Sequence, residues 1–224
     1  RFNFKLTANL TSSDTLSFGG QYDWYNQTGR VAWGPTAAAT DDRTSDQDSP
    51  EAVWNAQYRK VFGSSTFLEA KFTGWWGYYY VDPIKPGAAH YDVDSGAYSG
   101  GGGEYFWADR GRNQVNVSLS KFVQKAGQHN FKFGVEIERS RVRDRYAYAE
   151  EHGRPIAYYD YAGEPYMAYS YSYDLQGRNQ RESFFAQDQW KIGNVTANLG
   201  VRLDNIRGRS PVLDGVDLSV TEGG

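Results

Sequence analysis

The sequence contains no cysteine, a single methionine and no long apolar run. A membrane-spanning helix needs about 20 consecutive, mostly apolar residues, and no segment comes near that length, so a helical membrane protein is excluded. The net charge is −3 and no basic stripe is present, which argues against a nucleic-acid partner. The lack of cysteine fits both a reducing cytosol and a periplasmic route, so it does not decide the compartment.

Aromatic residues and glycine are abundant instead. The chain has 224 residues, with 18 Tyr, 7 Trp and 25 Gly. This composition favours strands and turns over helices. A transmembrane β-barrel remains possible for a polar sequence, because only every second residue of each strand of about ten residues must be apolar.

The clearest strand pattern lies at residues 184–204, FFAQDQWKIGNVTANLGVRLD, which reads as two strands joined by a short turn at IGN. Its second half alternates between an apolar set and a polar set, and successive side chains of a strand point to opposite faces. In a soluble sheet the apolar face would cover a core, whereas in a membrane barrel it would face lipid. The apolar set is Val195, Ala197, Leu199, Val201 and Leu203.

Three more hairpins show the same two-residue period. Short connections of about 4 to 6 residues join the strands of each hairpin, and long aperiodic segments separate the hairpins at 26–50, 77–112 and 140–180. A glycine-rich tail at 205–224 shows no further strand. The predicted strand pairs are 2–10 with 16–24, 52–61 with 66–76, 115–119 with 131–137, and 184–192 with 195–204.

Loop length therefore alternates between short and long, which is typical of bacterial outer-membrane barrels with tight periplasmic turns and long extracellular loops. We predict an all-β fold: an antiparallel transmembrane β-barrel segment of about eight strands in four hairpins. Both ends of the segment would lie at the outer surface, whereas a complete single-chain barrel of this type has both termini on the periplasmic side. Residues 1–224 are therefore expected to be part of one larger barrel domain, without its plug and barrel ends. A small soluble barrel with an apolar interior would leave the alternation of loop lengths unexplained.

The stretch 184–204 resembles the barrel hairpin of TonB-dependent outer-membrane receptors, in which an aromatic-x-Gln-Asp-x-Trp strand precedes a Leu-x-Leu-Gly-x-Arg-x-Asp strand. The strand that starts at Gly127 is similar to the family's Gly-x-His-x-x-Lys-Phe-Gly strand, and the combination is most similar to the Oar-like subgroup. The matching positions of the first motif are Gln187, Asp188, Trp190, Leu199, Gly200, Arg202 and Asp204.

The resemblance implies a receptor of the bacterial outer membrane that captures an extracellular ligand and imports it with energy delivered through TonB. It implies as partners outer-membrane lipid, a plug domain and the remaining barrel of the same parent chain, and TonB through that plug. It implies neither catalysis nor a cofactor. Two other functions stay open from the residues: a soluble all-β protein that binds or acts on carbohydrate, and a passive outer-membrane porin.

Tyrosine density marks a candidate ligand site. Nine of the 18 tyrosines lie between Tyr146 and Tyr173, and tyrosine offers a rigid flat ring and a hydroxyl at low entropic cost. Rings near the strand ends are explained by an aromatic girdle at the membrane interface, and loop packing explains others. The central four are predicted to contact ligand at the extracellular mouth: Tyr158, Tyr159, Tyr161 and Tyr166.

Other polar patterns favour no catalytic or metal site. Asp92, Asp94 and Gly96 have the spacing that begins a calcium loop, but a full site needs six or more oxygens and a later bidentate carboxylate. The three histidines are scattered, which argues against a transition-metal site. Glu136 and Glu138 suit a hydrated lumen wall better than a glycosidase acid and nucleophile, and no nucleophile elbow, phosphate loop or triad spacing is present.

Overall fold

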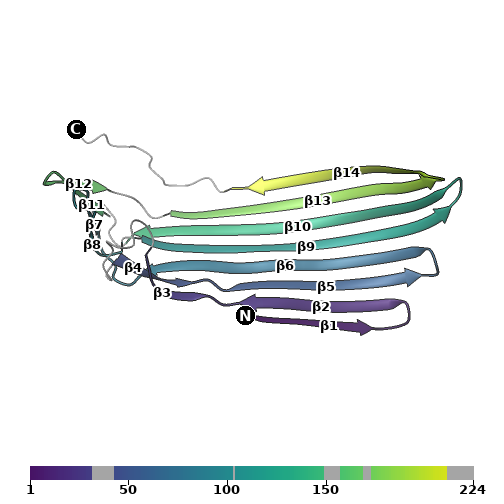
Figure 1. Cartoon of the computed structure of the whole chain (residues 1–224), viewed down its shortest axis with the longest axis horizontal. Helices are drawn as coiled ribbons and strands as arrows, with labels where there is room; N and C mark the ends of the chain where they lie inside the picture. Colours follow the sequence, from purple (N-terminus) through teal and green to yellow (C-terminus); the bar gives the residue numbers. More distant parts are fainter. Residues whose placement is uncertain (32–42, 103, 149–156, 169–172, 211–224) are drawn as a thin grey trace.

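The computed structural model describes residues 1–31, 43–102, 104–148, 157–168 and 173–210, and these residues form strands, turns and short connections. Among them no helix is long and apolar enough to span a membrane. All the strands of the described residues belong to two β-sheets, one large and one small (Figure 1). The all-β prediction is therefore confirmed.

The large sheet is a row of antiparallel hairpins in chain order, β1-β2-β5-β6-β9-β10-β13-β14. Each strand pairs with the strands before and after it in this row, and the sheet stays open, with β1 and β14 at its edges (Figure 1). The bounds are β1 Phe2–Asn9, β2 Asp14–Asp23, β5 Glu51–Phe62, β6 Thr66–Pro83, β9 Glu104–Gln124, β10 Gln128–Tyr148, β13 Tyr173–Ile192 and β14 Val195–Arg209.

The four predicted hairpin turns gather at one end of the large sheet (Figure 1). Left-handed backbone conformations allow two of them to be this tight, because Gly63 has φ 58° and Gly193 has φ 56°. Glycine adopts such angles without steric cost. The eight predicted strands, their order and their pairing in four hairpins are thus confirmed.

The strands reach farther from the turns than the sequence indicated. β9 begins at Glu104 and β10 continues to Tyr148, so the segments 77–112 and 140–180 are largely strand near their ends. β14 continues to Arg209, so the tail does not begin at residue 205. In these extensions polar and aromatic residues occupy both faces, and cross-strand ion pairs such as Arg143 with Asp174 lie among ring contacts such as Phe106 with Tyr146. Strands of this composition cannot be predicted from an alternation of apolar and polar residues.

Two further strands lie in the segment 26–50, which was wrongly predicted to be only a loop. β3 (Asn26–Val31) pairs with β4 (Thr44–Asp48), and β4 also pairs with the outer end of β6. Both strands are almost entirely polar, so again no apolar alternation marks them.

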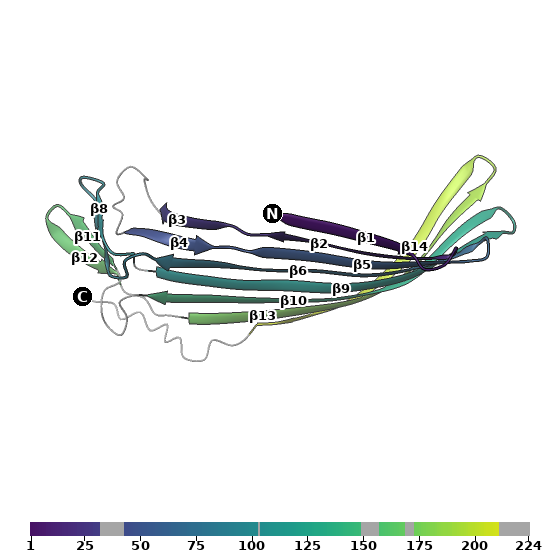
Figure 2. The ribbon, with the colours of Figure 1, turned by 90° about the horizontal axis from the view of Figure 1, so that it is seen from below.

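The small sheet has the order β12-β11-β7-β8 and lies at the end of the molecule opposite the tight turns (Figure 2). β11 pairs in parallel with β7, which brings two long connections of the sequence together. The bounds are β7 Ala89–Asp92, β8 Tyr98–Gly100, β11 Ala157–Tyr161 and β12 Glu164–Ala168.

The large sheet has one apolar face and one polar face. Cross-strand partners share a face, so the register groups Leu203 with Phe184, Val135 and Val117 across four strands. We call this face the apolar face and its continuous stripe of side chains the apolar band. Opposite it, the register groups Asp204 with Ser183 and Glu136 on the polar face.

The apolar band is exposed. Leu199 is 63% exposed and Phe184 is 61% exposed, and among the described residues the only buried hydrophobic residues are Val81 and Ala108. A soluble sheet of this size would bury its apolar face in a core. The structure has no such core among its described residues, which favours the membrane arrangement over the soluble one.

Candidate functional site

A network of charged side chains lies on the polar face where β10, β13 and β14 run side by side. Arg181 on β13 donates to Glu136 and, at 3.2 Å, to Glu138, both on β10. From β14, Arg202 Nη2 lies 3.5 Å from the same Glu136 carboxylate. Alternation along each strand explains why these residues, spaced two apart, meet on one face.

Ser183 joins the network to Asp204. Its side chain is 1% exposed, and it donates a hydrogen bond to Asp204 while accepting one of 2.8 Å from Arg202 Nη2. Arg202 also donates through Nε to Asp204 Oδ1 at 3.0 Å. Every member of this cluster except Glu138, which within it contacts Arg181 alone, is therefore held by at least two partners, and such a connected network stiffens this part of the sheet.

An open cavity of about 620 Å³ adjoins this network on the polar face. Lys132, Gln187 and Arg202 line it, and Gly134 lets the Phe185 ring lie flat against the strand beside it. A Cβ at Gly134 would come within 2.4 Å of that ring. This face of the large sheet is thus lined by charged and polar side chains, as expected for a lumen wall.

The motif residues from the sequence do not form one site. Gln187, Gly200, Arg202 and Asp204 lie on the polar face, whereas Asp188 and Trp190 lie on the apolar face. There, Asp188 Oδ2 lies 2.7 Å from Nδ1 of His129, and the Trp190 ring stacks on the His129 ring with centroids 5.3 Å apart.

This second group lies near the tight turns, at the edge of the apolar band. The Trp190 indole donates to the carbonyl of Ala126 at 3.1 Å, which ties β13 to the turn between β9 and β10. A polar pair flanked by rings suits a membrane interface, where one end of each ring is apolar and the other is wet. The sequence does not predict His129 as a site residue, although the family strand beginning at Gly127 contains it.

The four predicted ligand tyrosines lie in the small sheet, but on both of its faces. Tyr159 is paired with Tyr166 across β11 and β12, and Tyr161 lies two residues along, so these three share a face. They are 42%, 58% and 54% exposed, respectively. Tyr158 points to the other face, where its ring stacks on His90 with centroids 4.6 Å apart.

The sequence Asp92-Val-Asp94-Ser-Gly96 forms the turn between β7 and β8. Asp92 Oδ1 accepts hydrogen bonds of 2.9 Å from the backbone N–H groups of Asp94 and Ser95, and these lower the pKa of Asp92. Asp94 Oδ2 accepts from the backbone of Ala162 at 2.9 Å, which joins this turn to the β11–β12 hairpin. Both carboxylates therefore serve the backbone, and the described residues contain no group of three or more metal-binding side chains.

The open antiparallel sheet, with an exposed apolar face and a charged polar face, defines a segment of a transmembrane β-barrel. The family model described as "TonB dependent receptor-like, beta-barrel" matches residues 1–221. The chain belongs to this family of TonB-dependent receptors, whose barrels are outer-membrane proteins of Gram-negative bacteria and whose members are receptors and transporters.

Two solved structures share the fold. The Pseudomonas aeruginosa receptor FpvA, solved with a heterologous pyoverdine and iron, matches with a TM-score of 0.63 at 11% identity, over 93% of this chain and 30% of its own. The unliganded ferric citrate transporter FecA matches with a TM-score of 0.62 at 12% identity, over 93% and 29%. The chain thus spans less than a third of either structure. A search of curated proteins finds no match.

Proposed function

We propose that this chain is a wall segment of an outer-membrane receptor that takes up a ligand with energy delivered through TonB. The observation that carries the proposal is the division of the large sheet into an exposed apolar face and a charged polar face. Lipid would cover the first and a water-filled lumen would adjoin the second. Family membership supports the receptor over a soluble carbohydrate-active protein.

The parent receptor would supply the remaining parts. Because β1 and β14 are open edges, and unpaired backbone groups are costly in hydrocarbon, the rest of the barrel would pair with both. A plug domain of the same chain would lie against the polar face, where the Arg181 and Arg202 network offers fixed charges. TonB would act through that plug. The Oar-like subgroup stays a prediction from the sequence motifs.

Ligand capture is assigned to the small sheet. Tyr159, Tyr161 and Tyr166 present exposed rings on one face of it, at the end of the molecule opposite the tight turns (Figure 2). We assign Tyr158 to the same site through its support of the sheet, because its ring stacks on His90. FpvA and FecA are structures of a pyoverdine–iron complex and a ferric citrate transporter, so ferric chelates are the first ligand class to test.

The test uses the full-length parent receptor in a strain that lacks it. Cells are given radioactive iron as ferric pyoverdine or ferric citrate, or labelled maltohexaose, with and without a protonophore that collapses the inner-membrane energy source. We expect receptor-dependent accumulation of one probe that the protonophore abolishes. Accumulation insensitive to the protonophore would indicate a passive porin, and no receptor-dependent accumulation would contradict uptake of these ligand classes.

Tyrosine variants then test the site. Y159A/Y161A/Y166A should lose surface binding of the accumulated probe, whereas Y159F/Y161F/Y166F, which keeps the rings, should retain most of it. Membrane insertion and heat modifiability should be unchanged in both. Unaltered binding in the alanine variant, or lost insertion, would show that these rings are structural.

A further inference from the structure

Five arginines gather on the apolar-face side of the large sheet, beyond the apolar band and on the side away from the tight turns. In the register Arg141 lies opposite Arg178, which in turn lies opposite Arg209. In the next cross-strand row toward the apolar band, Gln180 lies between Arg139 and Arg207. We call these residues the arginine patch: Arg139, Arg141, Arg178, Arg207 and Arg209.

The arginine patch has no counter-ion within the described part of the chain. Neighbouring arginines on the same strands are paired, Arg143 with Asp174 and Arg145 with Asp109. The five patch side chains are all exposed, and none of them forms an ion pair or hydrogen bond with another residue that the structure describes. The nearby Glu182 accepts instead from the amides of Gln180 and Asn205.

Such an arrangement is unfavourable for the protein alone. Like charges directly opposite each other on neighbouring strands repel and destabilise the sheet. Two such contacts occur in a single row, Arg141 with Arg178 and Arg178 with Arg209. Guanidinium groups bind phosphate through two parallel hydrogen bonds, so an anion with phosphate groups would turn this repulsion into attraction.

The height of the patch identifies the source of that anion. On β10, Arg141 lies twelve positions after His129, which is at the edge of the band nearest the turns. At about 3.4 Å per residue and a tilt of about 40°, this span is about 30 Å along the membrane normal. The hydrocarbon core of a bilayer is about 30 Å thick. The patch therefore lies at the level of the lipid headgroups in the leaflet farther from the turns.

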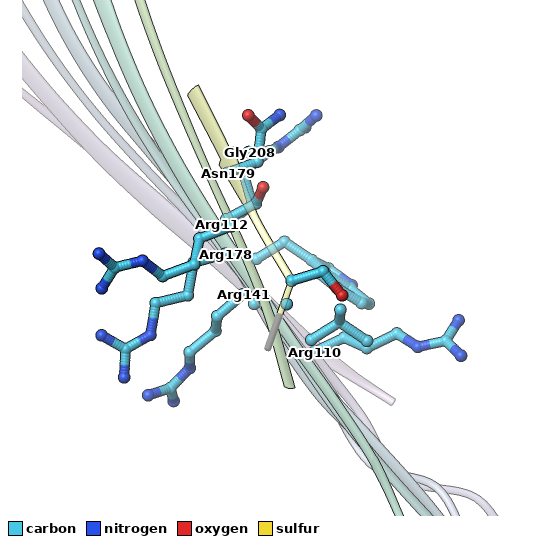
Figure 3. Close-up of a pocket in the computed structure, with 13 residues that line it drawn as sticks. Arg110, Arg112, Arg141, Arg178, Asn179 and Gly208 are labelled. Atoms are coloured by element: carbon cyan, nitrogen blue, oxygen red, sulfur yellow. The ribbon is translucent and has the colours of Figure 1, made fainter. Parts of the chain in front are cut away.

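A groove provides room for a ligand beside the patch. It measures about 940 Å³ and is lined by Arg139, Arg141 and Arg178 together with Trp54 and Trp76. A hollow along the same strands is shown in Figure 3, where Arg141 leaves the sheet on one side and Arg110 on the other. Gly111 lies beside the Arg141 side chain on this face, with the Arg141 Nε 3.7 Å from where a Cβ at position 111 would be.

We propose that the arginine patch binds the phosphate groups of phosphorylated lipids in the outer leaflet. The inference rests on the proposed membrane location but not on ligand uptake. Lipid phosphates would contact the guanidinium groups, and the Trp54 and Trp76 rings would contact the apolar part of the same lipid at the upper edge of the band. The patch then anchors the barrel wall vertically and surrounds it with tightly held lipid.

The experiment uses the purified full-length receptor in detergent, titrated with diphosphoryl lipid A in mixed micelles. Dephosphorylated lipid A tests the need for phosphate, and inorganic phosphate tests whether a free anion suffices. The variant R141Q/R178Q removes two patch charges. The matched control R110Q/R112Q removes two charges from the same stretch of the sheet but from the opposite face, because these residues alternate with Gly111. R141K/R178K keeps both positive charges but lacks the planar guanidinium groups, which can each donate two parallel hydrogen bonds to phosphate.

We expect R141Q/R178Q to bind diphosphoryl lipid A at least about tenfold more weakly, since each charge-assisted contact is worth about tenfold in affinity. R110Q/R112Q should bind as wild type, R141K/R178K should fall between, and all three should keep heat modifiability. Equal weakening in the control, unchanged binding in R141Q/R178Q, or equal binding of dephosphorylated lipid would overturn the proposal. Inorganic phosphate binding as tightly as the lipid would assign the patch to a free anion instead.

Discussion

Trp54 on β5 lies flat over Gly74 on β6, and a Cβ at Gly74 would fall 2.2 Å from the Trp54 ring. The two residues are direct cross-strand partners on the apolar face. The glycine therefore lets a large ring lie along the sheet at the upper edge of the apolar band. The same device appears on the polar face, where Gly134 accommodates Phe185.

Replacing Gly74 with valine in the intact receptor should force the Trp54 ring away from the sheet. Overpacking of this kind costs about 1 to 3 kcal/mol, so the midpoint of denaturant unfolding in micelles should fall. The control is Gly111→Ala on the same face, where the nearest atom would be at an ordinary 3.5 Å. Equal midpoints for G74V and wild type would show that the ring is free to move.

The charged network on the polar face predicts a second loss of stability on mutation. Arg181→Ala leaves Glu138, whose side chain is 15% exposed, without a partner among the described residues, and leaves Glu136, whose side chain is 13% exposed, with Arg202 alone at 3.5 Å. Unpaired, poorly exposed polar groups cost about 1 to 3 kcal/mol, so unfolding should begin at lower denaturant. Arg181→Lys should restore part of the loss. An unchanged denaturation midpoint in R181A would show that the network does not stabilise the fold.

The sequence predicted the hairpins because their central residues alternate, as Leu199, Val201 and Leu203 do. It missed the outer strand extensions because residues such as Arg143 and Asp174 pair by charge, and a polar strand has no apolar period. The alternation of side chains along a strand is enough to predict that Asp188 and Gln187 lie on opposite faces of the sheet. The contacts of Tyr159 with Tyr91 and of Tyr158 with His90 were not, because they depend on a parallel pairing between distant connections.

The turn between β7 and β8 should respond to acid. Hydrogen bonds from the backbone and side chain of Ser95 hold the pKa of Asp92 below its ordinary value of 3.8. Because the folded pKa is depressed, the stabilisation is fully present at neutral pH and is lost as pH falls through that lowered pKa. The protection of backbone amides in the segment 89–100 against exchange, taken relative to the intrinsic rate at each pH, should therefore fall below pH 3.8. Asp92→Asn should raise exchange at neutral pH and remove the acid response, and an unchanged response in D92N would contradict this origin.

The two faces predict opposite tolerance to charge. Leu199→Arg places a cation in the middle of the apolar band on β14 and should cost about 2 to 4 kcal/mol in the intact receptor near the midplane. Asn198→Arg, one residue away on the polar face, should cost little. The measurement is the unfolding free energy of each variant in lipid vesicles, and equal values at the two positions would contradict the lipid-facing assignment.

The most direct test of the central account is the accessibility of single spin labels along β14 in the full-length receptor in outer-membrane lipid. This chain has no cysteine, so each label needs one cysteine in place of Asn198, Leu199, Val201, Arg202 or Leu203. Collision with dissolved oxygen should be high at 199, 201 and 203, and collision with a water-soluble nickel chelate should be high at 198 and 202. Similar values at all five positions, or the reverse pattern, would contradict a wall with lipid on one face and water on the other.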